Sequence, residues 1–188
     1  SASALTWACY LLANAPQVQD RMHAEAMRQL GEREPEAGDI KQLDLTWRVV
    51  RVALRLFPPV GFFAREAATG CPMRDKQVPR GATVVVSPWL IHRHRQWWTQ
   101  PDAFDPDRYA DDGSREPLRQ AYLPFGMGPR VCLGAAFALQ EAALILASLV
   151  RRWRLEPVLG HVPVPVGRLT IRPANGVRVI LHRRKTHA

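Results

Sequence analysis

The sequence predicts an α+β fold in which helices dominate, and two observations carry this prediction. Apolar residues recur at helical spacing through residues 1–56 and again through 135–150. Short runs rich in β-branched and aromatic residues, bounded by glycine and proline, lie at 62–86 and 169–181 and are typical of strands. With 188 residues, 47% of them hydrophobic, the chain can bury one sizeable core.

The first third of the chain is expected to form three helices. Residues 1–15 carry an apolar helical stripe, and because the chain starts inside this pattern without an initiator methionine, we expect a cut end. Pro16 suits the first position of a second helix that ends near Leu30. Asp44 is expected to cap a third helix over 45–56, which Pro58 and Pro59 end. The predicted inward residues of the first two helices are Leu5, Ala8, Cys9, Leu12, Val18, Met22, Ala26 and Leu30.

The middle of the chain changes period. Residues 62–67 and 83–86 are expected to be short strands joined by turns. Ser87 followed by Pro88 predicts the cap and first position of a short helix that ends near Arg93. Residues 99–122 show little periodicity, and an irregular segment of that length is usually functional or clamped by specific side chains.

The C-terminal third is expected to hold one long helix and a hairpin. The helix covers 135–150 and is rich in alanine and leucine. Residues Leu169–Arg172 and Val177–Leu181 flank Asn175-Gly176, which predicts a hairpin turn between two paired strands.

Composition and charge exclude several classes of protein. Three cysteines without paired spacing argue against a disulfide framework or zinc site and predict a reducing, cytoplasmic setting. No apolar run is long enough to span a membrane, and the first residues lack the basic region of a signal peptide. The net charge of +9 comes without a nucleic-acid-binding motif, so we expect no nucleic acid and favour an acidic protein partner.

The most informative segment is the loop over residues 123–134. It places Cys132 behind a glycine-rich stretch that carries Arg130 and directly ahead of the helix over 135–150. The positive end of a helix and a neighbouring guanidinium both favour a thiolate, which is a soft ligand suited to iron. The loop therefore predicts a metal–thiolate site, with haem iron as the metal.

Four segments, in this order, resemble the C-terminal part of the cytochrome P450 family of haem-thiolate monooxygenases. Residues 3–7 are similar to the end of its I helix, 53–59 to the end of its K helix and 104–109 to its meander. Residues 125–134 match its FxxGxRxCxG signature at every defined position. The resemblance implies that residues 1–188 are a partial haem-binding domain. It would comprise the end of the I helix, the J and K helices, a small β-sheet, the meander, the cysteine-ligand loop, the L helix and a C-terminal hairpin.

The resemblance also assigns roles to individual residues. Cys132 would be the iron ligand, Gly126 and Gly128 would let the backbone pass close to it, and Gly134 would let the following helix lie against the porphyrin. Phe125 would pack on the thiolate side of the ring. The haem propionates need cations, for which the candidates are Arg130, Arg65 and His92. The acid–alcohol pair that handles dioxygen is expected upstream of Ser1, so no catalytic residue is expected in this chain.

One departure from the family pattern concerns the third helix. The family's Glu-x-x-Arg motif has valine in the glutamate position, at Val52, while Arg55 is present. Arg55 and Arg108, which would lock the meander, then approach each other without a shared carboxylate, unless Asp105 or Asp107 substitutes. Two buried like charges without a counter-ion are costly, so we expect weakened folding or haem retention. A rewired but functional variant is the alternative.

The expected function is that of a cytochrome P450 fragment. The parent would insert one oxygen atom from O2 into a lipophilic organic substrate, with electrons from an acidic ferredoxin- or flavodoxin-like partner. One alternative is a truncated or degenerate remnant without catalytic activity. Another is a haem-thiolate protein that uses peroxide or isomerises its substrate. Apolar residues 60–63 and the turn at 173–176 are the expected substrate-facing segments.

Overall fold

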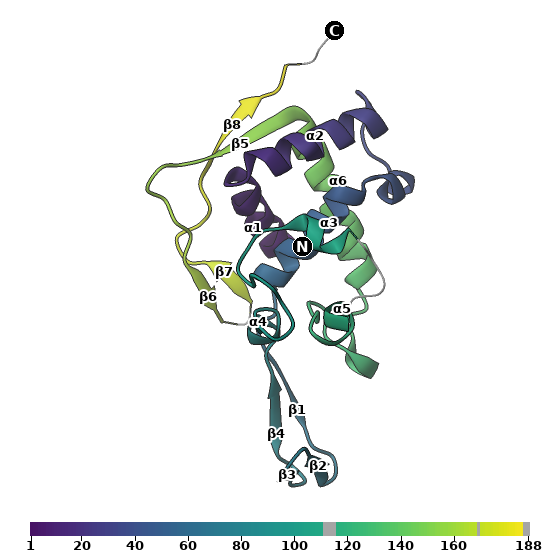
Figure 1. The fold of residues 1–188 in the computed structure, drawn as a ribbon, viewed down its shortest axis with the longest axis vertical. Helices are drawn as coiled ribbons and strands as arrows, with labels where there is room; N and C mark the ends of the chain where they lie inside the picture. The colour runs from purple at the N-terminus through teal and green to yellow at the C-terminus, as the bar shows by residue number, and fades with distance from the viewer. Residues whose placement is uncertain (111–115, 169, 186–188) are drawn as a thin grey trace.

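The computed structural model describes residues 1–110, 116–168 and 170–185. The α-helices are α1 (Ala2–Ala13), α2 (Pro16–Leu30), α3 (Asp44–Leu56), α4 (Pro88–Ile91), α5 (Glu116–Gln120) and α6 (Ala135–Arg152). The strands are β1 (Phe63–Glu66), β2 (Cys71–Met73), β3 (Lys76–Val78), β4 (Thr83–Val86), β5 (Trp153–Pro157), β6 (Pro165–Gly167), β7 (Ile171–Pro173) and β8 (Val179–Arg183). Short 3-10 helices cover Ala37–Gln42, Pro106–Tyr109 and Gly128–Arg130. The predicted class, α+β with helices dominant, is confirmed (Figure 1).

The helical body holds the main core. Helix α1 packs on α3, α2 packs on α6, and α3 lies against α6. The buried hydrophobic residues that these four helices contribute to the core are Ala4, Ala8, Leu12, Met22, Leu45, Val49, Val50, Ala53, Leu54, Ala142, Ala143, Leu146 and Val150. The predicted bounds of α2 are confirmed, because Pro16 supplies the first turn and the chain leaves the helix at Gly31 in a left-handed conformation.

The start of α3 differs from the prediction that Asp44 caps it. Asp44 is the first helical residue and forms an ion pair with Arg48 one turn later. The free N–H groups of this helix end are instead bound by Glu25 of α2, whose carboxylate accepts from the Leu45 and Thr46 amides at 2.7 and 2.9 Å. A side chain 20 residues away therefore does the work expected of a local cap.

Strands β1 and β4 pair antiparallel as predicted, with Phe63 opposite Val86 and Glu66 opposite Thr83. They continue into the hairpin of β2 and β3, which the sequence did not reveal; its turn places Arg74 at a positive φ of 56°. Together these four strands form a narrow arm that projects from the helical body, at the opposite end from the C-terminus (Figure 1).

The predicted pairing of the two strands around Asn175-Gly176 is wrong. Strand β7 pairs with β6, whereas β8 pairs with β5, so that Leu155 lies opposite Leu181. Leu169, which the prediction placed in the first strand, lies outside the described residues. The side chain of Asn175 binds the backbone of Val162 and Val164 at 2.9 Å, which ties the turn to the preceding segment instead of closing a hairpin.

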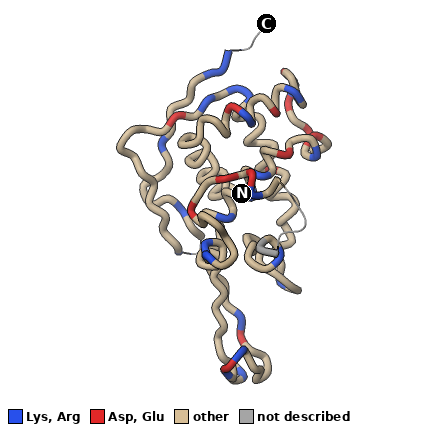
Figure 2. Tube along the Cα trace, in the orientation of Figure 1, with Lys and Arg blue, Asp and Glu red and all other residues tan. Residues whose placement is uncertain are grey.

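Charged residues are spread over the molecule. Figure 2 shows basic and acidic positions interspersed on the helical body and at the tip of the arm. Within the described ranges, none of the helices combines the length and apolarity needed to cross a membrane.

Candidate functional site

The loop that precedes α6 is shaped by its two glycines. Gly126 and Gly128 have φ of 77° and 73°, in the left-handed region that other residues rarely adopt. Gly126 N–H donates to Leu123 O at 3.2 Å, and Cys132 N–H donates to Phe125 O at 3.0 Å. These bonds fold the loop back on itself, so that Cys132 leaves it at a defined point directly before α6.

The sulfur of Cys132 lies at the surface, beside the first turn of α6. Gly134 is the residue before the helix, and a Cβ built on it would lie 3.9 Å from the Cys132 Sγ. Glycine at this position keeps the space next to the sulfur open. Free cysteines are usually buried, so an exposed one at the start of a helix is notable.

Several residues close to Cys132 in the chain are apolar and exposed. Leu133 is fully exposed, Phe137 is 69% exposed, and Met127 and Val131 are also exposed. The buried residues of α6 lie in its second half, between Ala142 and Arg151, whereas Phe137 in its first half is exposed. Exposed apolar residues next to one soft ligand fit a large flat ring with a bound metal.

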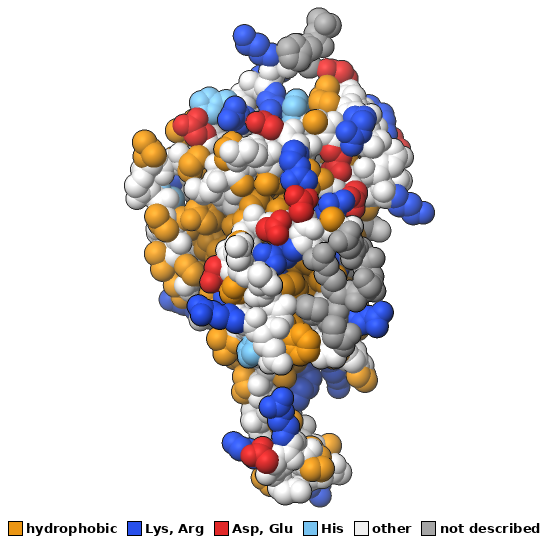
Figure 3. All heavy atoms as spheres, in the orientation of Figure 1, with side chains coloured by type: hydrophobic (Ala, Val, Ile, Leu, Met, Phe, Trp, Pro, Cys, Tyr) orange, Lys and Arg blue, Asp and Glu red, His pale blue; other side chains and the backbone are white. Residues whose placement is uncertain are grey.

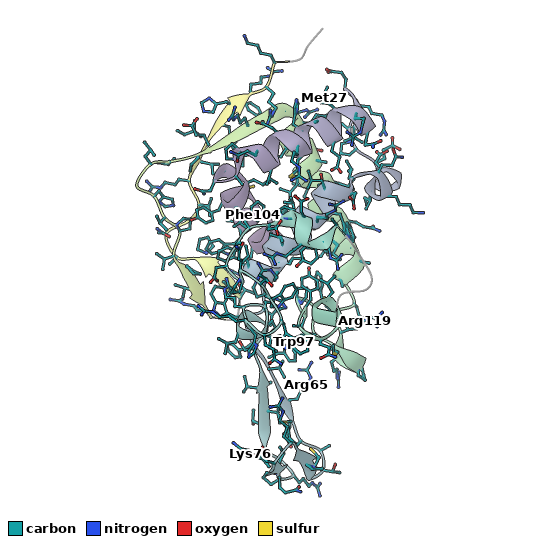
Figure 4. All side chains as sticks on the ribbon, viewed as in Figure 1. Met27, Arg65, Lys76, Trp97, Phe104 and Arg119 are labelled. Carbon is teal, nitrogen blue, oxygen red and sulfur yellow. The ribbon has the colours of Figure 1, made fainter. Side chains whose placement is uncertain are left out.

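The two candidate propionate arginines are both exposed but differ in placement. Arg130 ends the 3-10 helix two residues before Cys132, and it forms no hydrogen bond or ion pair with the part of the chain that the structure describes. Arg65 lies on the arm, in β1 (Figure 4). Its guanidinium covers the Phe63 ring at 4.9 Å and donates to Ala64 O at 2.8 Å.

His92, the third candidate, is completely buried and has both ring nitrogens engaged. Nδ1 is 3.1 Å from the backbone oxygen of Arg55, and Nε2 accepts from the Leu123 N–H at 2.7 Å. Burial lowers the pKa of His92 to about 4. A neutral, buried imidazole without a free nitrogen has nothing to offer a carboxylate, so His92 does not fit the role of a propionate ligand.

Arg55 is also completely buried, and backbone carbonyls take the place of a carboxylate. Its guanidinium donates to the oxygens of His92 at 2.9 Å, Pro101 at 2.5 Å and Ala103 at 3.0 Å, and lies 5.1 Å from the centre of the Trp98 ring. His92 follows helix α4, whereas Pro101 and Ala103 lie in the irregular segment. Arg55 thus ties α3 to the segment over residues 99–110.

Val52 lies one turn before Arg55 in an apolar cluster with Leu56 and Tyr109. Two buried donors, the Arg55 Nε and the Tyr109 hydroxyl, have no hydrogen-bond partner among the described residues. Burial, and then the nearby charge of Arg108, lower the pKa of Arg55 to about 10. The charge of Arg108 thus acts in the direction expected for two arginines without a shared carboxylate.

The two aspartates proposed as substitutes have different partners. Asp105 Oδ2 lies 3.9 Å from Arg108, which makes Asp105 the nearer counter-ion of that arginine. Asp107 pairs with Arg21 of α2 at 2.7 Å and approaches Arg48 of α3 at 3.6 Å. Among the described residues, the hydrogen bonds of the Arg55 guanidinium go to the three carbonyls and not to either aspartate.

Sequence reasoning missed the aromatic residues around this cluster. Tyr122 stacks on the His92 ring at 5.5 Å and donates its hydroxyl to Arg51 O at 3.1 Å. Trp98 provides the ring over which Arg55 lies. Large aromatic residues in a segment without periodicity were the only available signal.

A separate apolar pocket of about 440 Å³ lies between the segment at residues 61–62, helix α4 and strands β6 and β7. Its lining includes Gly61, Phe62, Trp89, Leu90 and Ile171, so it contains part of the segment expected to face a substrate. Hydrophobic side chains are widely exposed across the middle of the face drawn in Figure 3.

The residues around Cys132 fit a haem group. The sulfur would bind the iron, the exposed apolar residues would cover one side of the ring, and Arg130 is placed to bind a propionate. Haem held by a thiolate supplies the chemistry of dioxygen activation. The chain would contribute the ligand, the apolar surface and the loop geometry.

Comparison with known proteins agrees with this fit. The family model described as Cytochrome P450 matches residues 1–177. Cyclooctatin synthase of Streptomyces melanosporofaciens is 41% identical over 175 residues, which are 92% of this chain and 38% of that protein. Cyclooctat-9-en-7-ol 5-monooxygenase of the same organism is 38% identical over 160 residues, 85% of this chain and 35% of that protein.

A solved structure, the cytochrome P450DA heme domain, matches the fold with a TM-score of 0.90 and 31% identity, over 98% of this chain and 41% of that one. The chain thus spans well under half the length of each of these relatives. With the cysteine loop, the buried arginine of α3 and the agreement in fold all in place, this chain belongs to the cytochrome P450 family.

Proposed function

We propose that residues 1–188 form the C-terminal part of the haem-binding domain of a monooxygenase. The parent protein would insert one oxygen atom from O2 into a lipophilic organic substrate, with electrons from a redox partner. The observation that carries this proposal is the exposed Cys132, with exposed apolar residues next to it in the chain. Relatives named as a synthase and a monooxygenase support it.

In this proposal Cys132 is the iron ligand, and Arg130 and Arg65 bind the two propionates. Gly126, Gly128 and Gly134 keep the backbone and the helix start close to the ring without a side chain in between. Phe125 packs against the core at the base of the loop. The exposed first half of α6 would be covered by the ring and by a further part of the fold.

A haem-loading experiment tests the iron ligand. The chain is refolded with haem, reduced and exposed to CO, and the position of the Soret band is recorded. We expect the red-shifted band of thiolate ligation in the wild type and its complete loss in Cys132→Ser. Cys71→Ser is the matched control, since Cys71 is also exposed but lies on the arm in β2. A red-shifted band that survives in Cys132→Ser refutes the assignment.

The runner-up is a remnant that binds haem weakly or not at all, and Val52 is the observation that favours it. If neither the isolated chain nor a chain extended to the length of its relatives shows the red-shifted band, the remnant is the correct alternative. A band in the extended chain alone supports a domain that needs its other half.

The partner proposed for the parent is an acidic electron-transfer protein, because the chain carries 26 lysines and arginines against 17 acidic residues. Charge-steered association weakens as salt screens it. Electron-transfer rates that are independent of ionic strength would count against this partner.

A further inference from the structure

We infer that His92 is a positioning residue that fixes the Cys132 loop to the end of α3 through the backbone of Leu123. The resemblance to the family made His92 a candidate cation for a propionate. In the structure, His92 instead binds two backbone groups. The hydrogen-bond part of this inference is independent of the proposed function, and only its spectroscopic readout depends on haem binding.

One side of the imidazole binds the end of α3. The backbone oxygen of Arg55 lies in the last turn of that helix, where carbonyls lack a partner within the helix. His92 Nδ1 lies 3.1 Å from this oxygen and must donate, because a carbonyl oxygen only accepts. In return, the backbone oxygen of His92 accepts from Arg55 Nη1 at 2.9 Å. The two residues are therefore bound to each other twice.

The other side of the imidazole binds the loop. With Nδ1 protonated, Nε2 of the neutral ring is an acceptor, and it takes the Leu123 N–H at 2.7 Å. Leu123 is buried, so this N–H would otherwise be a buried donor without a partner. The tautomer of His92 is thus set from both sides, and each nitrogen has one specific task.

Leu123 connects directly to the iron-ligand position. Its carbonyl accepts from Gly126 N–H at 3.2 Å, which starts the loop, and Phe125 O accepts from Cys132 N–H at 3.0 Å, which closes it. Tyr122, the residue before Leu123, stacks on the His92 ring at 5.5 Å with an interplanar angle of 23°. The ring is therefore held in place by the same segment that it anchors.

Two substitutions at His92 separate its nitrogens. In His92→Asn the side-chain amide can still donate near the Nδ1 position but does not reach Leu123. In His92→Gln the longer side chain can place an acceptor near the Nε2 position. The inference therefore predicts that the loop is held in place wherever an acceptor for the Leu123 N–H remains. His92→Gln should hold the loop almost as well as the wild type, and His92→Asn should not.

The first measurement is amide hydrogen exchange in the 188-residue chain. Protection of the Leu123 and Cys132 amides is compared with that of Leu146, a buried residue of α6, which corrects for any change in global stability. Relative to Leu146, we expect protection at both loop amides to fall about tenfold in His92→Asn, because one buried hydrogen bond is lost. In His92→Gln, which keeps an acceptor for Leu123, protection should fall by less than about threefold. Equal effects of the two variants overturn the inference, as does a wild-type Leu123 amide that exchanges as fast as exposed backbone.

The second measurement is the CO spectrum of the haem-loaded protein. We expect a smaller fraction of the red-shifted thiolate band in His92→Asn than in His92→Gln at equal haem content. A difference in exchange supports the role of His92 whether or not haem binds. The proposed function is refuted separately, if a chain extended to the length of its relatives also binds no haem. If His92→Asn and His92→Gln show equal exchange and equal spectra, the role of His92 is refuted and the proposed function is not.

Discussion

Replacement of Val52 by glutamate tests how α3 tolerates a buried arginine without a carboxylate. Val52 and Arg55 are three residues apart on one helix and share a face. The introduced carboxylate would lie among the donors that lack partners in the described residues, the Arg55 Nε and the Tyr109 hydroxyl. We expect Val52→Glu to stabilise the protein relative to Val52→Gln, its uncharged isostere.

The magnitude follows from the environment of Arg55. Burial, with Arg108 second, lowers its pKa to about 10. Since each pKa unit corresponds to 1.36 kcal/mol, keeping Arg55 charged costs about 3 kcal/mol. A carboxylate must itself leave water, so we expect about half of this to be recovered, about 1.5 kcal/mol between the two variants. Both variants lose the packing of Val52 equally, so their difference isolates the charge.

The assay is urea unfolding followed by tryptophan fluorescence, at pH 7 and at pH 3. The advantage of Val52→Glu should be present at pH 7 and vanish at pH 3, because a carboxylate whose pKa is lowered by a cation loses its contribution as the pH falls. Haem occupancy of the haem-loaded protein should rise in parallel. If Val52→Glu is less stable than Val52→Gln at pH 7, or haem occupancy does not rise, the missing glutamate does not limit this protein.

Three further changes probe other parts of the structure. Burial lowers the pKa of His92 to about 4, so between pH 6.5 and 4 the unfolded chain binds a proton at this residue and the folded protein does not. The difference in free energy of unfolding between wild type and His92→Gln should therefore be constant above about pH 6.5. It should shift against the wild type by about 3 kcal/mol as the pH drops to 4. Gly61→Ala should cost about 1 kcal/mol, since its Cβ would lie 2.7 Å from Ile171 Cδ1, and Ile171→Val should relieve that cost. Glu25→Gln should cost about 2 kcal/mol in urea unfolding, because the charged acceptor of the Leu45 and Thr46 amides is lost.

Each of these predictions has an outcome that contradicts it. A stability difference between wild type and His92→Gln that stays flat from pH 6.5 to 4 rules out a buried neutral imidazole. Additive costs in the Gly61→Ala, Ile171→Val double variant exclude the proposed contact. Asp44→Asn is the control for Glu25→Gln, because Asp44 also lies at the start of α3 but is exposed. If both variants lose the same free energy of unfolding, negative charge near the helix end is responsible and the hydrogen bonds of Glu25 are not.

Local features of the fold could be predicted because a few neighbouring residues determine them. The bounds of α2 follow from Pro16 and an apolar stripe, and the cap of α4 is Ser87, whose hydroxyl accepts from Leu90 N–H at 3.4 Å. The start of α3 could not be predicted in this way. Its cap is Glu25, and no local pattern distinguishes that glutamate from others on the exposed side of a helix.

Strand pairing was predictable only where the partners are close in sequence. Strands β1 and β4 were identified by composition, and they meet because a short hairpin joins them. Strand β8 pairs with β5 because Leu155 is buried against α2, where Gln19 binds both its N–H and its carbonyl at 2.8 Å. That long-range burial outweighs the turn signal of Asn175-Gly176.

The sequence by itself determined the family, the mainly helical class and the position of Cys132, since a ten-residue motif encodes the loop and its glycines encode its shape. The tertiary structure decided which groups serve Arg55 and His92. Three carbonyls from the segment over 92–103 hold the arginine, and the imidazole binds two backbone groups from different elements. Such partners are backbone atoms, present at every residue, so only folding determines which of them meet.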